Sequence, residues 1–257
     1  MTVTVLAENT TCQEGITAQH GLSLYIETGD VRILFDMGQD DTFLHNAQKL
    51  GIDLSKVDVA VISHGHYDHG GGLGAFLQVN ASAPVYLHEF AFADYYNGTE
   101  KYIGLDQKHK QDPRLIFTKG SRNLSPKLRL TDCNDLYWHC EPWGLNRREG
   151  ETFVPDAFLH EQYLEVTEGN HRILISGCSH KGILNIAEHF RPDVLIGGFH
   201  LNKLEDMEAL DSIAGRLLSH NTVYYTGHCT GEKQYRELKE KMGCRLKRLS
   251  TGMVFEV

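Results

Sequence analysis

The 257-residue sequence has no run of lysine and arginine, and its formal net charge is −9. Because binding to a nucleic-acid backbone needs clustered positive charge, no nucleic acid is expected as the main partner. No segment approaches the roughly 18 unbroken apolar residues that a membrane span requires. The first residues, MTVTVLAENTT, lack a basic region followed by an apolar one, so they do not resemble a secretory signal. We therefore expect a cytoplasmic protein with a small-molecule substrate and no membrane partner.

Cysteine is present without the spacing that would give it a structural role. The six residues are Cys12, Cys133, Cys140, Cys178, Cys229 and Cys244. A disulfide framework or a cysteine-based zinc site would show short or repeated Cys-x-x-Cys spacings, and none occurs. We expect reduced thiols.

The order of apolar runs predicts a single domain that covers residues 1–257. The first part is mainly β, with strands expected at 3–7, 21–28, 31–38, 57–63 and 83–90 and a helix over 40–52. The second part alternates, with strands expected over 163–177 and at 193–199, 222–227 and 252–257, and helices at 181–190, 205–219 and 232–243. A β core covered by helices is the simplest architecture that fits this order.

Residues 91 to about 150 interrupt this regularity. They carry many charges and little periodicity, and their tyrosines and tryptophans include Tyr95, Tyr96, Tyr102, Tyr137, Trp138 and Trp143. A long irregular stretch inside a compact domain is usually functional. We interpret it as a lid or insertion over a pocket.

The most informative segment is VISHGHYDHGGG, residues 61–72, which follows an expected buried strand. His64 and His66 lie two apart on an extended segment and so face the same side, where they can share one ion. Asp68 and His69 can serve a second ion, which would make a two-metal site. Imidazole and carboxylate are the ligands of catalytic zinc and similar ions.

Three further histidines follow later strands. His180 in SGCSHKG, His200 in GGFHL and His228 in YTGHCTG each come directly after an expected strand, next to small residues. Ligand-type residues placed repeatedly at strand ends are typical of an active site on one edge of a β core. We expect His200 to take a pocket or substrate role there.

HGHYDH resembles the HxHxDH signature of the metallo-β-lactamase superfamily, and the likeness extends over nearly the whole chain. LAENTT, HGLSLYIE, GCSHKGI, GGFHL and GHCTG resemble more narrowly the dihydropterin-ribofuranosylaminobenzene-phosphate synthase-like branch. The resemblance implies an α+β fold, a four-layer αββα sandwich. It also implies that Asp36, in ILFDMG, orients a ligand histidine.

By resemblance, six residues would bind two divalent metal ions, zinc first and manganese or iron as alternatives. His64, His66 and His180 would hold one ion, and Asp68, His69 and His228 the other. The bridging aspartate of many members is absent, and Cys178 stands at the nearest counterpart of its position. The Cys178 thiolate could replace the carboxylate; alternatively the bridge is missing and the second metal site is weak or empty. His160 is an alternative to His180 as the fifth histidine ligand.

These ligands favour a metal-dependent hydrolase, in which a metal-bound hydroxide attacks an ester, thioester, lactone or phosphoester. Asp68 would orient the hydroxide and accept its proton, and His200 would donate to the substrate or leaving group. The alternative is a transferase of the branch type, with divalent ions stabilising a diphosphate leaving group. A third interpretation, a metal-binding sensor without turnover, is disfavoured by the size of the ligand set.

Overall fold

The computed structural model describes residues 1–136 and 138–257, and their internal contacts divide into two compact units. The first unit comprises residues 1–119, 144–162 and 250–257, and the second comprises 120–143 and 163–249. Among the described residues, every helix is too short or too polar to cross a lipid bilayer.

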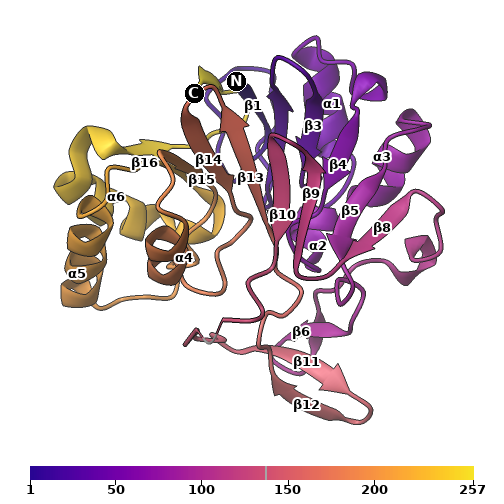
Figure 1. The fold of residues 1–257 in the computed structure, drawn as a ribbon. Helices are drawn as coiled ribbons and strands as arrows, with labels where there is room; N and C mark the ends of the chain where they lie inside the picture. The colour runs from indigo at the N-terminus through magenta and orange to yellow at the C-terminus, as the bar shows by residue number, and fades with distance from the viewer. Residues whose placement is uncertain (137) are drawn as a thin grey trace. The chain divides into compact units, whose positions relative to one another are not determined.

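The first unit contains a seven-stranded mixed sheet. In spatial order its strands are β18 (Val254–Glu256), β1 (Thr2–Ala7), β2 (Ser23–Glu27), β3 (Arg32–Phe35), β4 (Val59–Val61), β5 (Val85–His88) and β8 (Leu115–Thr118). Its helices are α1 (Thr42–Lys49), η1 (Leu54–Lys56), α2 (Tyr67–Gly70), α3 (Leu73–Val79) and η2 (Gln107–His109). Strands β3, β4, β5 and β8 are parallel, so the segments after β3 and β4 leave the same edge of the sheet (Figure 1).

Helices α1 and α3 pack on this sheet through apolar faces. Phe43 and Ala47 of α1 and Phe76 of α3 are buried against Leu34 and Ala60 of the strands. Gly51 follows α1 with φ +75°, the left-handed conformation that ends many helices and that glycine adopts without strain. The helix therefore ends at Lys49, inside the expected range 40–52.

A small four-stranded sheet completes the first unit. Its strands, in spatial order, are β12 (Thr152–Pro155), β11 (Leu145–Glu149), β6 (Tyr95–Asn97) and β7 (Lys101–Tyr102). This small sheet is formed largely by residues of the stretch 91–150. Other parts of that stretch join the large sheets: 115–118 forms β8 of the first, and 121–131 contains two strands of the second. The role of this stretch as a lid stays a prediction, and Tyr137 lies outside the described residues.

The second unit contains another seven-stranded sheet. Its strands are β17 (Leu246–Arg248), β16 (Val223–Thr226), β15 (Val194–Ile196), β14 (His171–Ile175), β13 (Tyr163–Glu168), β10 (Leu128–Thr131) and β9 (Ser121–Ser125). Its helices are α4 (Ile183–Phe190), α5 (Met207–Leu218), η3 (His228–Thr230), α6 (Glu232–Met242) and η4 (Gly243–Arg245), with α4, α5 and α6 visible in Figure 1.

Strands β14, β15, β16 and β17 run parallel, so the carboxyl ends of β14, β15 and β16 meet at one sheet edge. Ile186 of α4, Leu217 of α5 and Leu238 of α6 pack with Leu195 and Tyr224 of the strands in one core. Each unit thus combines a mixed sheet with helices, which confirms the α+β class.

Candidate metal centre

The histidine motif lies at the carboxyl end of β4, in a loop that leads directly into α2. The ring centroids of His64 and His66 are 4.6 Å apart, and those of His64 and His69 are 4.1 Å apart. All three side chains are buried. The structure therefore brings the motif histidines together, as the sequence predicts.

Glycines allow this loop to pack closely. A Cβ atom at Gly65 would clash with the Ala91 carbonyl, and one at Gly72 would clash with the Met37 carbonyl. The glycines within and after the motif are thus needed because the backbone of neighbouring segments packs directly against them.

Asp36 organises two of the histidines. Its carboxylate is fully buried, accepts hydrogen bonds from the Ser63 backbone N–H and hydroxyl at 2.7 Å each, and lies 2.6 Å from Nδ1 of His69. Because a carboxylate only accepts, Nδ1 of His69 carries the proton and Nε2 carries the lone pair.

Ser63 fixes the tautomer of His64 in the same way. Its single hydroxyl proton goes to Asp36, so its oxygen accepts from Nδ1 of His64 at 2.8 Å. Nε2 of His64 therefore also carries a lone pair. One buried carboxylate fixes the tautomers of two neighbouring histidines, which is how metal-binding histidines are held.

Asp36 also has φ +58°, a backbone conformation that is costly for a residue other than glycine. Ser179, His200 and His228, all at strand-end loops of the second unit, share this conformation, with φ between +48° and +59°. Such strain persists where the surroundings over-determine the backbone, and it clusters at functional sites.

A second network surrounds His66. Nε2 of His66 lies 3.9 Å from Asp156 Oδ2, and the same oxygen is 3.0 Å from Nε2 of His160. Nδ1 of His160 accepts from the Gly65 N–H at 2.8 Å, and its ring lies 3.9 Å from that of Tyr95. Both nitrogens of His160 are thus engaged: Nδ1 as an acceptor and Nε2 as a donor.

The environment sets the charges in this network. Burial, together with the electrostatic interaction with His160, lowers the pKa of His66 to about 3. His66 is therefore neutral near pH 7, the form that binds metal ions. Burial acts to raise the pKa of Asp156, but the electrostatic interaction and hydrogen bond with His160 outweigh it and hold that pKa below its ordinary value.

Asp68 stands at the start of α2, and its carboxylate lies 4.0 Å from Nε2 of His69. On its other side, Nε2 of His20 is 3.2 Å away, and His20 is about half exposed. His20 directly precedes the apolar run GLSLYIE, residues 21–27, and was not among the candidate site residues predicted from the sequence. Asp68 is thus flanked by imidazoles and remains partly accessible.

The second unit gathers the later candidates at its sheet edge. Cys178 and His180 follow β14, His200 follows β15, and His228 and Cys229 follow β16. The rings of His180 and His200 are 4.1 Å apart. The parallel strands thus place His180 beside His200, and they place His228 at the carboxyl end of the neighbouring strand β16.

Hydrogen bonds tie these three loops together. Gly198 N–H donates to the Gly177 carbonyl at 2.8 Å, and Phe199 N–H donates to Oγ1 of Thr230 at 3.0 Å. Burial acts to raise the pKa of the Cys229 thiol, but hydrogen bonds with Cys178 and His200 hold it well below its ordinary value. Nothing in the sequence spacing distinguishes Cys229 from the other thiols.

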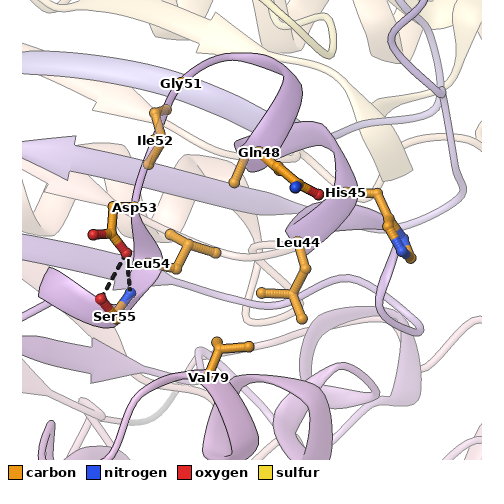
Figure 2. A pocket seen from close by; sticks show the side chains of 10 residues that line it. Leu44, His45, Gln48, Gly51, Ile52, Asp53, Leu54, Ser55 and Val79 are labelled. Atoms are coloured by element: carbon orange, nitrogen blue, oxygen red, sulfur yellow. Dashed lines mark hydrogen bonds between the residues drawn. The ribbon is translucent and has the colours of Figure 1, made fainter.

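A cavity of about 520 Å³ lies elsewhere in the first unit, beside α1, η1 and α3 (Figure 2). Leu44, Leu54 and Val79 line it. The carboxylate of Asp53 accepts from the Ser55 N–H and hydroxyl, which caps η1. Asp53 supplies the one carboxylate among the residues that line this cavity, and that carboxylate already accepts the hydrogen bonds that cap η1. We therefore assign no chemical function to the cavity.

The chain matches one family model and two curated relatives over most of its length. The family model described as the Metallo-beta-lactamase superfamily matches residues 16–228. An uncharacterized protein of Methanocaldococcus jannaschii is 31% identical over 251 residues, covering 93% of this chain and 94% of the relative. The 7,8-dihydropterin-6-methyl-4-(beta-D-ribofuranosyl)-aminobenzene-5'-phosphate synthase of the same organism is 28% identical over 269 residues, covering 93% and 90%.

Solved structures agree with these relatives. The crystal structure of Tm1679, described as a metal-dependent hydrolase of the beta-lactamase superfamily, matches with a TM-score of 0.83 and 29% identity over 100% of this chain and 99% of that one. The metallo-beta-lactamase fold protein YhfI of Bacillus subtilis matches with a TM-score of 0.60 and 16% identity over 99% of each chain, a likeness of fold alone.

Proposed function

Because the chain belongs to the metallo-β-lactamase superfamily, we propose that it is a metal-dependent hydrolase that cleaves an ester, thioester, lactone or phosphoester. The observation that carries the proposal is the Asp36–Ser63 network, which fixes the tautomers of His64 and His69 so that each offers a lone pair on Nε2. A purely structural histidine pair would not need both Nδ1 protons directed into one buried carboxylate network.

The donor set fits divalent metal ions. We propose that His64, His66, Asp68, His69, His180 and His228 are the ligands of two ions, zinc being favoured by the imidazole content. When bound, the ions would lower the pKa of water and polarise the oxygen of the scissile bond.

His160 is left out of this ligand set. Nδ1 of His160 already accepts from Gly65, and Nε2 donates to Asp156. A lone pair would reach a metal only if one of these buried hydrogen bonds broke, at a cost of about 1–3 kcal/mol. We therefore assign His180 as the ligand and His160 as a residue that positions the motif loop.

In the reaction, Asp68 would orient the attacking water and accept its proton. Its partly accessible carboxylate and its contact with His20 suit this exchange, since His20 can pass the proton to solvent. We propose that His200, at the carboxyl end of β15, donates a proton to the substrate or leaving group.

The named synthase relative favours one other candidate, a transferase in which the ions stabilise a leaving diphosphate. The chain offers little for the diphosphate itself: the helices next to the glycine run are only four and seven residues long, and the glycines are used in packing. We therefore place hydrolysis first.

The test is turnover in ¹⁸O-labelled water. Metal-stripped and zinc- or manganese-reconstituted protein would be assayed on phosphodiester, thioester and lactone substrates, with Asp68→Asn as the inactive variant and Asp58→Asn as the surface control. Hydrolysis predicts ¹⁸O in the product, dependent on metal, and a loss in Asp68→Asn of about 100-fold or more. Metal-dependent transfer of the pterin group from its diphosphate to an added ribofuranosylaminobenzene phosphate, with release of diphosphate and without ¹⁸O incorporation, would favour the transferase instead.

A further inference from the structure

Residues 156–162 follow β12 in the first unit and lie beside the histidine motif. The Gln162 N–H donates to the Ser63 carbonyl at 2.8 Å, directly before the first motif histidine. Nδ1 of His160 accepts from the Gly65 N–H at 2.8 Å, directly after it. The segment is thus hydrogen bonded to the motif backbone at two points, and its side chains are held at a fixed place beside the motif.

Asp156 is a buried carboxylate of this segment that faces a proposed metal ligand. Its Oδ1 accepts from the Phe158 N–H at 2.8 Å, and its Oδ2 lies 3.0 Å from Nε2 of His160. The same Oδ2 lies 3.9 Å from Nε2 of His66. Two hydrogen bonds within the segment therefore direct one carboxylate oxygen towards two imidazole nitrogens.

This arrangement has a consequence for the proton of His66. An imidazole binds a metal ion in its neutral form, which has a single N–H. Because a carboxylate oxygen only accepts, the nitrogen that faces Asp156 carries that proton, and the lone pair lies on Nδ1. His64 and His69 have the opposite tautomer, set by the Asp36 network. His66 therefore needs an acceptor of its own.

We propose that Asp156 is a positioning residue of the metal centre: its carboxylate accepts the Nε2 proton of His66 and leaves the lone pair of that ring on Nδ1 for the ion. The inference rests on the proposed function, because it assigns Asp156 this task only if His66 binds a metal. The distance of 3.9 Å must shorten by about 1 Å to reach the usual length of a charge-assisted hydrogen bond. A carboxylate that orients a ligand histidine in this way typically raises metal affinity about 10- to 100-fold.

The first test is zinc competition against a chromophoric chelator with full-length Asp156→Asn. If the new oxygen keeps the Phe158 N–H, the new amide group faces the imidazole N–H groups, donor against donor. We expect the affinity for one of the two ions to fall about 10- to 100-fold. Asp94→Asn is the matched control, because Asp94 is an exposed carboxylate of the same unit whose partner is Arg148; it should bind zinc as the wild type does.

A second variant separates a direct effect on His66 from support given through His160. If Asp156 acted only by holding His160, then Asp156→Asn would change nothing further in a His160→Ala background. A direct contact with His66 predicts a further loss of zinc affinity there, of about tenfold or more. Urea unfolding of each metal-free variant would verify that it is folded.

A spectroscopic readout locates the proton itself. Zinc-loaded protein labelled with ¹⁵N-histidine would be examined by long-range ¹H–¹⁵N correlation, which distinguishes the two imidazole tautomers. His66→Ala identifies the His66 signals by their absence. We expect the His66 proton on Nε2 and the protons of His64 and His69 on Nδ1. This measurement on the wild type decides the tautomer even if a variant fails to fold.

Three results would each overturn the proposal: zinc affinity in Asp156→Asn equal to that of Asp94→Asn, no further loss in the His160→Ala background, or a His66 proton on Nδ1. A protein that binds no zinc would overturn it together with the metal centre. None of these readouts uses a substrate. Turnover without ¹⁸O incorporation would therefore contradict the proposed hydrolysis and leave the role of Asp156 standing.

Discussion

Replacing Asp36 with asparagine tests whether one buried carboxylate organises the histidine motif. In the native protein Oδ1 accepts from the Ser63 N–H, and Oδ2 accepts from the Ser63 hydroxyl and from His69. An asparagine side chain has only one accepting oxygen, so it can replace only one of the two accepting oxygens of Asp36. Its amide group must face either the Ser63 N–H, donor against donor, or Nδ1 of His69, which would then lose its proton to Nε2.

Both orientations carry a cost that can be estimated. An unmatched buried donor destabilises the folded protein by about 1–3 kcal/mol. Loss of the partner that orients a ligand histidine weakens metal binding about 10- to 100-fold, or about 1.4–2.8 kcal/mol. We expect Asp36→Asn to show both effects while the fold is retained.

The assay is zinc competition against a chromophoric chelator, with urea unfolding of the metal-stripped protein measured in parallel. Asp58→Asn is the matched control: Asp58 accepts from the Arg32 N–H at 2.8 Å at the other end of β3 and β4 and is exposed. Zinc affinity in Asp36→Asn equal to that of the control would refute the proposed role of Asp36.

Three other predictions follow from the described contacts. Ser63→Ala should weaken zinc binding about tenfold, because His64 loses its Nδ1 partner, whereas Ser63→Thr should retain most of the affinity in the same competition assay. Burial raises the pKa of Tyr224 to about 12; since the folded pKa lies above the unfolded value of about 10, about 2–3 kcal/mol of stability is present below pH ~10 and lost towards pH ~12, and Tyr224→Phe should flatten that part of the unfolding profile. Gly198→Ala should lower the unfolding free energy by about 1–3 kcal/mol, because the new methyl group meets the neighbouring cysteine sulfur, whereas Gly215→Ala, which meets only a distant lysine nitrogen, should not lower it.

The elements that carry buried apolar residues could be predicted from the sequence. The helices α1, α4, α5 and α6 and the strands β2 to β5 lie within their expected ranges, and β1 begins one residue before its expected range. Strands β9 and β17 were not predicted, because they are short and largely polar at the sheet edges, where pairing rather than burial defines them. The four-stranded sheet was missed for the same reason.

The site divides in a similar way. The motif and the strand-end histidines carry a local signal, and a contact between Asp36 and a ligand histidine was expected from the resemblance, although the resemblance did not say which histidine. Ser63, Asp156 and the engagement of both His160 nitrogens depend on contacts between residues as far as 95 positions apart. Such contacts leave no pattern in a single sequence.

The central claim, that this chain is built to hold two metal ions for hydrolysis, is tested most directly by elemental analysis of the purified protein beside His66→Ala and the exposed-residue control His139→Ala. The account predicts about two divalent ions per chain in the wild type and the control, and fewer in His66→Ala. A wild-type protein that binds no metal, or whose metal content His66→Ala leaves unchanged, would contradict it.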